Sequence, residues 1–213
     1  MEKIDLILDI LKETYPDAAC ALNYGTPYEL LVATILSAQC TDVRVNIITG
    51  ELFKEYNTPE KMLELTEEEL GEKIKSCGLY KNKSKNIIAA TKMLVAEFGG
   101  RVPDKMEELL MLPGVGRKTA NVVLANAFGK PAIAVDTHVF RVSNRLGIAK
   151  GKTPEEVEKG LMKAVPEEMW GHAHHLLIAH GRNLCAARKP RCGECPLAPF
   201  CDIERLEKTR DEV

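Results

Sequence analysis

The chain has 213 residues, of which 45% are hydrophobic and 28% charged, with a formal net charge of −2 at pH 7. This composition is ordinary for a globular domain, and the longest apolar stretch, at 30–36, is far too short to span a membrane. Acidic residues interrupt the apolar positions of the N-terminal stretch, which argues against a signal peptide, so we expect a cytoplasmic protein with no membrane partner.

Helix signals recur along the whole chain. An apolar stripe at Ile4, Ile7, Leu8 and Leu11 predicts a first helix. Capping threonines followed three residues later by glutamate predict further helix starts, and glycines stand where helices should end. These positions are Thr26, Thr66 and Thr153 for the starts, and Gly78, Gly99, Gly129 and Gly147 for the ends. Strict two-residue alternation is absent, and only 132–135 could form a short strand, so the fold class is all-α with about ten helices.

Positive charge gathers in three stretches despite the net negative charge. Residues 75–92 and 180–192 contain lysine or arginine and no acid, and 113–150 contains a single aspartate. Such runs are compatible with ordinary solvated helix faces, but local positive faces are also what binds a phosphate backbone.

The stretch 112–121 (LPGVGRKTAN) is the most informative in the chain. A short helix should precede it and an amphipathic helix should follow, giving a hairpin at about 103–128. Gly114 and Gly116 permit unusual backbone angles and close approach of another backbone. Free N–H groups at the second helix would suit a phosphate, although the same pattern fits a purely structural corner.

Two charged residues in this half of the chain have alternative roles. Lys118 would lie in the first turn of the second hairpin helix, where a phosphate contact is the simpler interpretation and a nucleophilic amine the alternative. Asp136 follows an apolar run and precedes another helix, which is typical of an N-cap, and a catalytic carboxylate could occupy the same position.

Four of the seven cysteines lie within 17 residues. Cys185, Cys192, Cys195 and Cys201 give the spacing C-x6-C-x2-C-x5-C. Four thiolates in one loop suit either a tetrahedral zinc ion or a [4Fe–4S] cluster, and the spacing alone leaves both open.

Five segments in order resemble the endonuclease III family of DNA glycosylases. They are 36–42 (LSAQCTD), 78–80 (GLY), 112–120 (LPGVGRKTA), 135–142 (VDTHVFRV) and the cysteine cluster. The resemblance implies a base excision repair enzyme that acts on damaged double-stranded DNA as a nucleoid-associated monomer. Cys40 stands where many relatives have threonine, which is a small departure.

The resemblance also implies catalytic roles. Lys118 would attack the sugar C1′ as nucleophile, displace the base, form a Schiff base and nick the strand by β-elimination, with Asp136 as its carboxylate partner. The four cysteines would hold a [4Fe–4S] cluster. The adenine-mismatch glycosylases are similar but usually lack this lysine, which favours a combined glycosylase and lyase acting on oxidised pyrimidines and abasic sites.

Further residues would grip the DNA. By resemblance Gln39 would enter the gap left by the extruded nucleotide and Leu79 would wedge between bases. The remaining contacts would come from Leu112, Gly114, Val115, Gly116, His138 and Lys189. Lys81, Lys83 and Lys85, next to Leu79, suit contacts with the DNA backbone.

The family fold implies two helical domains. A six-helix barrel would occupy 20–130 and carry the hairpin, while 1–19 plus 131–213 would form the cluster domain. Two alternatives stay open. One is a glycosylase of the same fold that prefers another base, such as mismatched thymine, and the other is a non-catalytic DNA-binding module with zinc or iron–sulfur in its loop.

Overall fold

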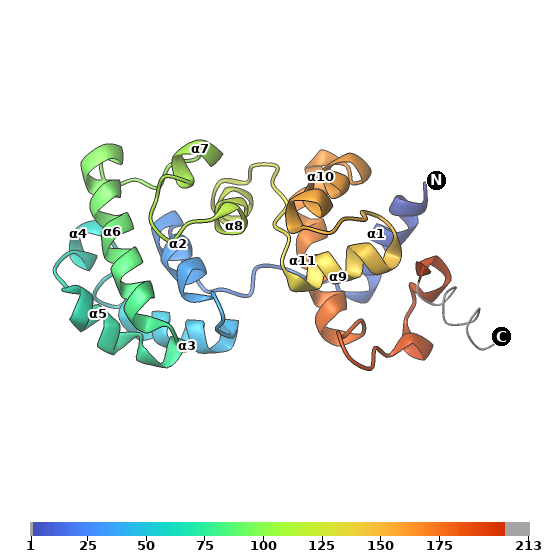
Figure 1. The fold of residues 1–213 in the computed structure, drawn as a ribbon, viewed down its shortest axis with the longest axis horizontal. Helices are drawn as coiled ribbons and strands as arrows, with labels where there is room; N and C mark the ends of the chain where they lie inside the picture. The colour runs from blue at the N-terminus through green and yellow to red at the C-terminus, as the bar shows by residue number, and fades with distance from the viewer. Residues whose placement is uncertain (1, 203–213) are drawn as a thin grey trace. The chain divides into compact units, whose positions relative to one another are not determined.

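The computed structural model describes residues 2–202, which form helices and connecting loops with no β-strand (Figure 1). The α-helices are α1 Lys3–Thr14, α2 Pro27–Leu36, α3 Asp42–Leu52, α4 Pro59–Met62, α5 Glu67–Lys73, α6 Tyr80–Phe98, α7 Met106–Leu109, α8 Arg117–Phe128, α9 Thr137–Leu146, α10 Pro154–Ala164 and α11 Trp170–Asn183. The 3₁₀ turns are η1 Lys75–Cys77, η2 Glu167–Met169, η3 Cys192–Glu194 and η4 Ala198–Phe200. The all-α prediction is therefore confirmed, and residues 132–135 form a connector without regular secondary structure. No helix within 2–202 is long and apolar enough to cross a membrane.

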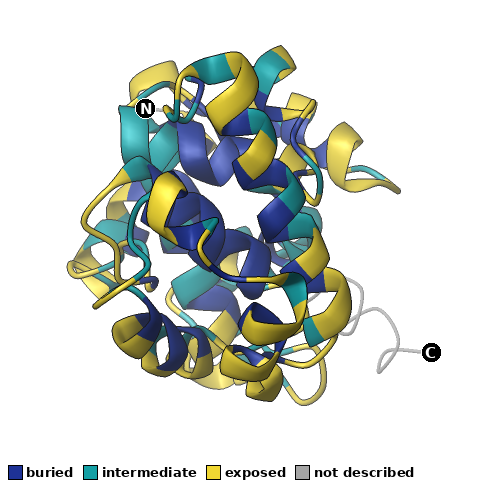
Figure 2. Cartoon of the chain, turned by 90° about the vertical axis from the view of Figure 1, so that its left-hand side faces the viewer, coloured by how far each residue is buried: buried dark blue, intermediate teal, exposed yellow. Residues whose placement is uncertain are grey.

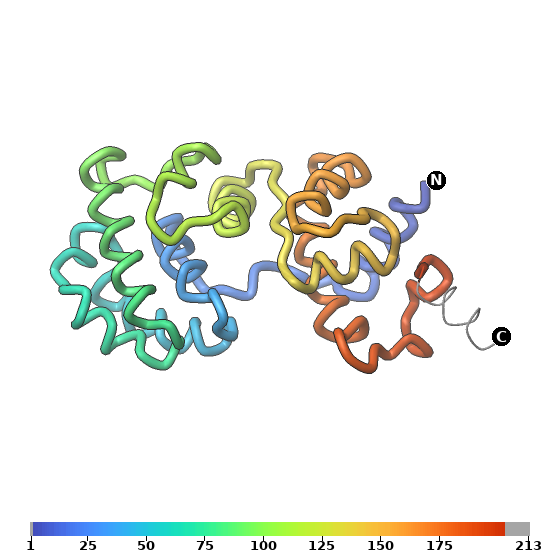
Figure 3. The backbone as a smooth tube through the Cα atoms, viewed as in Figure 1, coloured from blue at the N-terminus to red at the C-terminus, as the bar shows by residue number. Residues whose placement is uncertain are grey.

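The chain divides into two compact units. One unit is Cys20–Lys130, and the other joins Met1–Ala19 to Pro131–Val213. The backbone path in Figure 3 shows how the second unit forms, because the N-terminal α1 lies among helices from the C-terminal part of the chain.

The helix ends follow the local sequence signals. The Thr66 hydroxyl accepts a hydrogen bond from the Glu69 N–H at 3.1 Å, and the Glu69 carboxylate accepts one from the Thr66 N–H at 2.8 Å. Thr26 and Thr153 also cap their helices, but the glutamate three residues on reaches an earlier N–H instead. The glycines predicted to end helices occupy left-handed or other positive-φ positions there. These caps satisfy N–H and C=O groups that a helix leaves unpaired at its ends.

The Cys20–Lys130 unit is organised around α2. All of α2 except its first residue is buried, and it packs against α3, α6 and α8. A largely apolar helix that is buried on every side is stable only when other helices surround it. Figure 2 shows the resulting pattern, in which buried faces turn inward and exposed faces outward.

The second unit has its own apolar core. Helix α9 packs on α10 and α11, and α1 packs on α11. The stripe Ile4, Ile7, Leu8 and Leu11 predicted for the first helix is buried in this core. The same core contacts Cys185, Cys195 and Cys201, so the cysteine loop lies against folded helices.

Candidate active site and metal centre

The turn between α7 and α8 depends on Gly114. Its φ is +79°, and an added Cβ would lie 2.8 Å from the Asn86 Cβ. Gly116 differs from the expectation, because its φ is −97° and a Cβ there would meet nothing within 4 Å. Only Gly114 is therefore required by the fold, whereas the space in front of Gly116 stays open.

Helix α8 begins without a side-chain cap. Gly116 occupies the N-cap position and has no side chain to accept a hydrogen bond, so no N-cap side chain satisfies the first N–H groups of the helix. Lys118, the second residue of α8, is exposed and makes no hydrogen bond or ion pair within the part of the chain that the structure describes. This end of α8 combines uncapped N–H groups with a free amine, which is an arrangement suited to an anion.

Asp136 caps α9 with one of its two carboxylate oxygens. Its Oδ1 accepts hydrogen bonds from the N–H groups of His138 and Val139, both at 2.8 Å. Its side chain is half-buried, and the other oxygen, Oδ2, has no hydrogen bond to any of residues 2–202. The N-cap interpretation is therefore right, and a second oxygen remains available for chemistry.

His138 is held in a defined orientation. Its Nδ1 lies 3.2 Å from Nη2 of Arg141, and the guanidinium has only donors to offer. Nδ1 must therefore accept, so the proton of the neutral ring lies on Nε2. That N–H makes no hydrogen bond to any of residues 2–202, so it can donate to an acceptor outside the protein.

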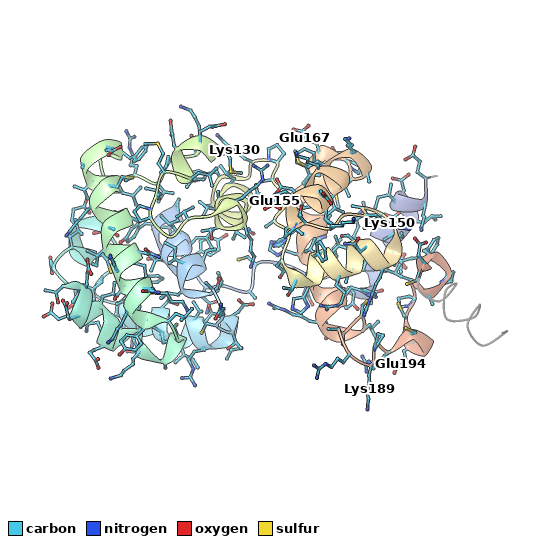
Figure 4. All side chains as sticks on the ribbon, in the orientation of Figure 1. Lys130, Lys150, Glu155, Glu167, Lys189 and Glu194 are labelled. Atoms are coloured by element: carbon cyan, nitrogen blue, oxygen red, sulfur yellow. The ribbon has the colours of Figure 1, made fainter. Side chains whose placement is uncertain are left out.

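Three residues with side chains adopt positive φ angles among the described part of the chain. They are Gln39 at 55°, Leu79 at 47° and Lys189 at 51°. All three are exposed, and Leu79 has 54% of its surface accessible although it is a large apolar residue. Figure 4 shows Lys189 projecting outward from its loop. Strained backbone at exposed positions is typical of functional sites, and these residues belong to the DNA-contact set implied by the sequence.

Two other members of that set are placed differently. The side chains of Leu112 and Val115 are buried, so they support the hairpin and could meet DNA only through their backbone. The prediction for Lys83 is wrong, because its side chain is only 4% exposed and cannot reach a phosphate. Lys81 and Lys85 are exposed, as expected for backbone contacts.

The four cysteines line a single cavity of about 250 Å³. Within residues 2–202, no group of three or more Cys, His, Asp or Glu side chains is arranged to hold one metal ion. Four cysteine thiols around one cavity supply the ligand set that a [4Fe–4S] cluster requires. Burial raises the pKa of Cys195, so its thiolate depends on the charge of a bound metal. The residues therefore fit a [4Fe–4S] cluster.

Two arginines of α9 hold the cysteine loop. Arg141 donates to the carbonyls of Cys185 at 2.9 Å and Gly181 at 3.0 Å. Arg145 donates to the Ala186 carbonyl at 2.7 Å and to Cys185 Sγ at 3.3 Å. Sequence analysis did not assign this role, although two arginines four residues apart share one helix face and could have indicated it.

His180 of α11 also contacts the cysteine loop. Its Nε2 lies 3.6 Å from Cys195 Sγ, and its Nδ1 lies 3.2 Å from the Tyr15 hydroxyl. Burial lowers the pKa of His180 to about 4, so its ring is neutral at pH 7. A neutral ring has one donor and one acceptor nitrogen, which suits its place between the hydroxyl and the sulfur.

The sequence matches two family models. Residues 32–167 match the HhH-GPD superfamily of base excision DNA repair proteins. Residues 185–201, which contain all four cysteines, match the iron-sulfur binding domain of endonuclease III. The chain is 54% identical to endonuclease III of Bacillus subtilis over 94% of its length and 92% of that protein. It is 52% identical to endonuclease III of Escherichia coli K12, over 93% of this chain and 94% of that one.

Solved structures are similar over almost the whole chain. A trapped covalent intermediate of endonuclease III with DNA has a TM-score of 0.92 and 48% identity, covering 97% of both chains. A thermostable thymine-DNA glycosylase has a TM-score of 0.85 and 25% identity, covering 95% of this chain and 96% of that one.

Proposed function

The chain belongs to the HhH-GPD superfamily of base excision DNA repair proteins, and we propose that Lys118 and Asp136 carry out its chemistry. The enzyme is a DNA N-glycosylase and abasic-site lyase that removes oxidised pyrimidines from duplex DNA. The observation that carries the assignment is the exposed amine of Lys118 at the uncapped start of α8, which has no partner among the residues that the structure describes. An amine with those surroundings is available for nucleophilic attack.

The proposed reaction begins when the damaged nucleotide leaves the base stack. The Nζ of Lys118 forms a bond to the sugar C1′, and the bond from C1′ to the base breaks. Asp136 accepts the proton that the amine loses, and its Oδ2 is the oxygen available because Oδ1 is engaged by two N–H groups. The negative charge of Asp136 also stabilises the positive sugar as the base departs.

The lyase step follows from the same bond. Ring opening gives a Schiff base between Lys118 and C1′, which makes a C2′ proton acidic. Loss of that proton breaks the C3′–O bond and nicks the strand on the 3′ side. Hydrolysis then releases the enzyme.

DNA contacts come from both units in this proposal. Gln39 and Leu79 enter the space vacated by the nucleotide, supported by the strained, exposed backbone of both residues. Gly114 and Gly116 let the hairpin approach a phosphate closely, and the Nε2–H of His138 donates to another phosphate. Leu112 and Val115 take part only through backbone groups. Lys189 adds a positive charge from the cysteine loop.

The cysteines bind a [4Fe–4S] cluster that serves a structural role and takes part in no step of the reaction. When bound, it fixes a loop that also carries Arg188, Lys189 and Arg191. Each chain holds one complete set of reactive groups, which supports a monomer as the acting form. Association with the nucleoid follows from the DNA substrate.

Borohydride trapping on duplex DNA with an abasic site tests the assignment. The unmodified protein should form a covalent adduct, because borohydride reduces the Schiff base to a stable amine. Lys118→Gln should abolish the adduct and base removal together. Lys61→Gln, which changes an exposed lysine of α4, is the matched control and should trap normally. If the unmodified protein binds DNA but forms no adduct, the catalytic assignment is wrong and the protein is a non-catalytic DNA-binding module.

A further inference from the structure

Lys83 is a buried lysine with a well-defined set of hydrogen bonds. It lies in the first turns of α6 and is 4% exposed. Its Nζ donates to the Leu36 carbonyl at 2.9 Å and to the Cys77 carbonyl at 2.8 Å. Its own backbone N–H donates to the Leu79 carbonyl at 3.0 Å. The side chain therefore joins the ends of α2 and η1, each of which leads into a loop.

The carbonyls of Leu36 and Cys77 lie two or three residues before the two residues proposed to enter the DNA. Leu36 ends α2, three residues before Gln39. Cys77 ends η1, two residues before Leu79. Because one amine bonds both carbonyls, the two loops share a fixed point close to the start of each.

The side chains beside the two loops also meet. Burial, and then a hydrogen bond with the Cys40 thiol, raise the pKa of Cys77 above its ordinary value. Cys40 directly follows Gln39 in the sequence. The two loops are therefore joined by the contact between Cys40 and Cys77 as well as by Lys83.

Burying a lysine is costly unless its donors are satisfied. Burial lowers the pKa of the Lys83 amine, because a charge is less stable in the protein interior than in water. The neutral amine would still retain two N–H donors, enough for both carbonyls. An apolar side chain could fill the same space, but it would leave both carbonyls unpaired. The specific contribution of a lysine at this position is the link between the loops.

We propose that Lys83 is a positioning residue that ties the Gln39 loop to the Leu79 loop, so that both side chains enter the duplex as one unit. This inference rests on the proposed function, because it takes Gln39 and Leu79 as the residues that fill the gap. Lys83 itself touches neither DNA nor the reacting atoms. Its effect should appear only where a nucleotide has to be extruded from paired, stacked DNA.

Two substrates separate this role from a general loss of folding. The first is duplex DNA with an oxidised pyrimidine, and the second is an abasic site in a short unpaired bubble between duplex arms, where the nucleotide is already unstacked. Lys83→Met should slow single-turnover base removal from the duplex by at least about tenfold, since misplacement by 1 Å can cost about 100-fold. Borohydride trapping on the bubble should stay within about threefold of the unmodified protein.

A reporter of insertion adds a direct readout. The fluorescence of 2-aminopurine placed next to the lesion rises when neighbouring bases unstack, and Lys83→Met should reduce that rise. Lys83→Gln keeps a hydrogen-bond donor on a shorter side chain, so its fluorescence rise should lie between those of Lys83→Met and the unmodified protein. It replaces Lys83→Met in the test if that variant does not fold. Lys61→Met removes an exposed charge from the same unit and should change neither reaction.

The outcomes are distinguishable. If the variants lose both reactions equally, or lose neither, Lys83 is only structural and the inference is overturned. If the unmodified protein gives no adduct on either substrate, the proposed function itself fails. A selective loss on the paired duplex, together with a smaller fluorescence rise, supports the positioning role.

Discussion

Asp136 combines a structural and a chemical task on separate oxygens. Oδ1 caps α9 through two N–H groups, while Oδ2 has no hydrogen bond within the described residues. The cap fixes the direction of the carboxylate, because an oxygen that accepts two bonds from a rigid helix turn cannot rotate freely. Substitutions at this residue can therefore separate stability from catalysis.

Asp136→Asn should keep the fold and lose the reaction. Asparagine caps a helix as well as aspartate, so the free energy of unfolding should change by less than about 0.5 kcal/mol. Without a carboxylate to accept the proton, single-turnover base removal should fall by about 10²- to 10⁴-fold. Asp136→Ala should lose activity and also about 1 kcal/mol of stability. Equal activity in Asp136→Asn and the unmodified enzyme would remove Asp136 from the mechanism.

At the scale of elements, the turn into α8 shows how two glycines of one motif differ. Gly114 has a left-handed backbone and is in close contact with Asn86, whereas Gly116 has an extended backbone and open space before it. The first is required for folding. The second leaves the uncapped N–H groups of α8 accessible to a phosphate.

The two glycines should respond differently to alanine. Gly114→Ala should lower the free energy of unfolding by about 1–3 kcal/mol, because alanine is strained at positive φ and meets Asn86. Gly116→Ala should lower stability by less than about 1 kcal/mol, the ordinary cost of alanine at an N-cap, but weaken binding to abasic-site duplex about tenfold, or about 1.4 kcal/mol. Denaturant titration and fluorescence anisotropy measure the two effects. Gly50→Ala, on an exposed and unhindered site of α3, should affect neither adversely.

The cysteine loop depends on the guanidinium group of Arg145. This side chain donates to two loop carbonyls and to Cys185 Sγ, which needs several donors in one plane. Arg145→Lys keeps the charge but loses the planar set of guanidinium donors. A chelator should therefore remove iron from this variant faster than from the unmodified protein. Iron content and visible absorbance over time provide the measurement. Retention of iron equal to that of the unmodified protein would show that charge alone suffices.

At the scale of the whole molecule, the two units differ in how acid should affect them. The unit with α9, α10 and α11 contains His175, whose pKa burial lowers to about 3, with the charges of His174 and His172 as smaller causes. The ordinary value is 6.5. In the folded protein this ring is therefore neutral over a range where the unfolded chain would be protonated.

This difference predicts the direction of an acid effect. The stability that His175 contributes is complete above pH 6.5 and falls as the pH drops towards 3, because only the unfolded chain gains the proton. Between pH 7 and pH 5 the loss from this residue should be about 1–2 kcal/mol. Denaturation at both pH values should show a smaller difference for His175→Gln than for the unmodified protein. An identical difference in both would contradict the assignment.

Local interactions explain what could be predicted from the sequence. A capping box such as that of Thr66 and Glu69 involves residues three apart, so its pattern predicts a helix start without any knowledge of the rest of the fold. The buried stripe of α1 follows from helical periodicity in the same way. The family, the all-α class and the iron–sulfur loop could be predicted from the sequence because their motifs are short and continuous.

Contacts between distant residues decided the rest. Lys81, Lys83 and Lys85 look equivalent in the sequence, yet Lys83 turns to the buried face that it shares with Ile87 and Leu94 and bonds a carbonyl 47 residues away. The positive φ angles of Gln39, Leu79 and Lys189 have no signal in the local sequence either. The sequence alone determined which chemical groups and helices are present. Only the tertiary structure decided which side chains are buried, strained or free, because packing depends on partners far apart in the chain.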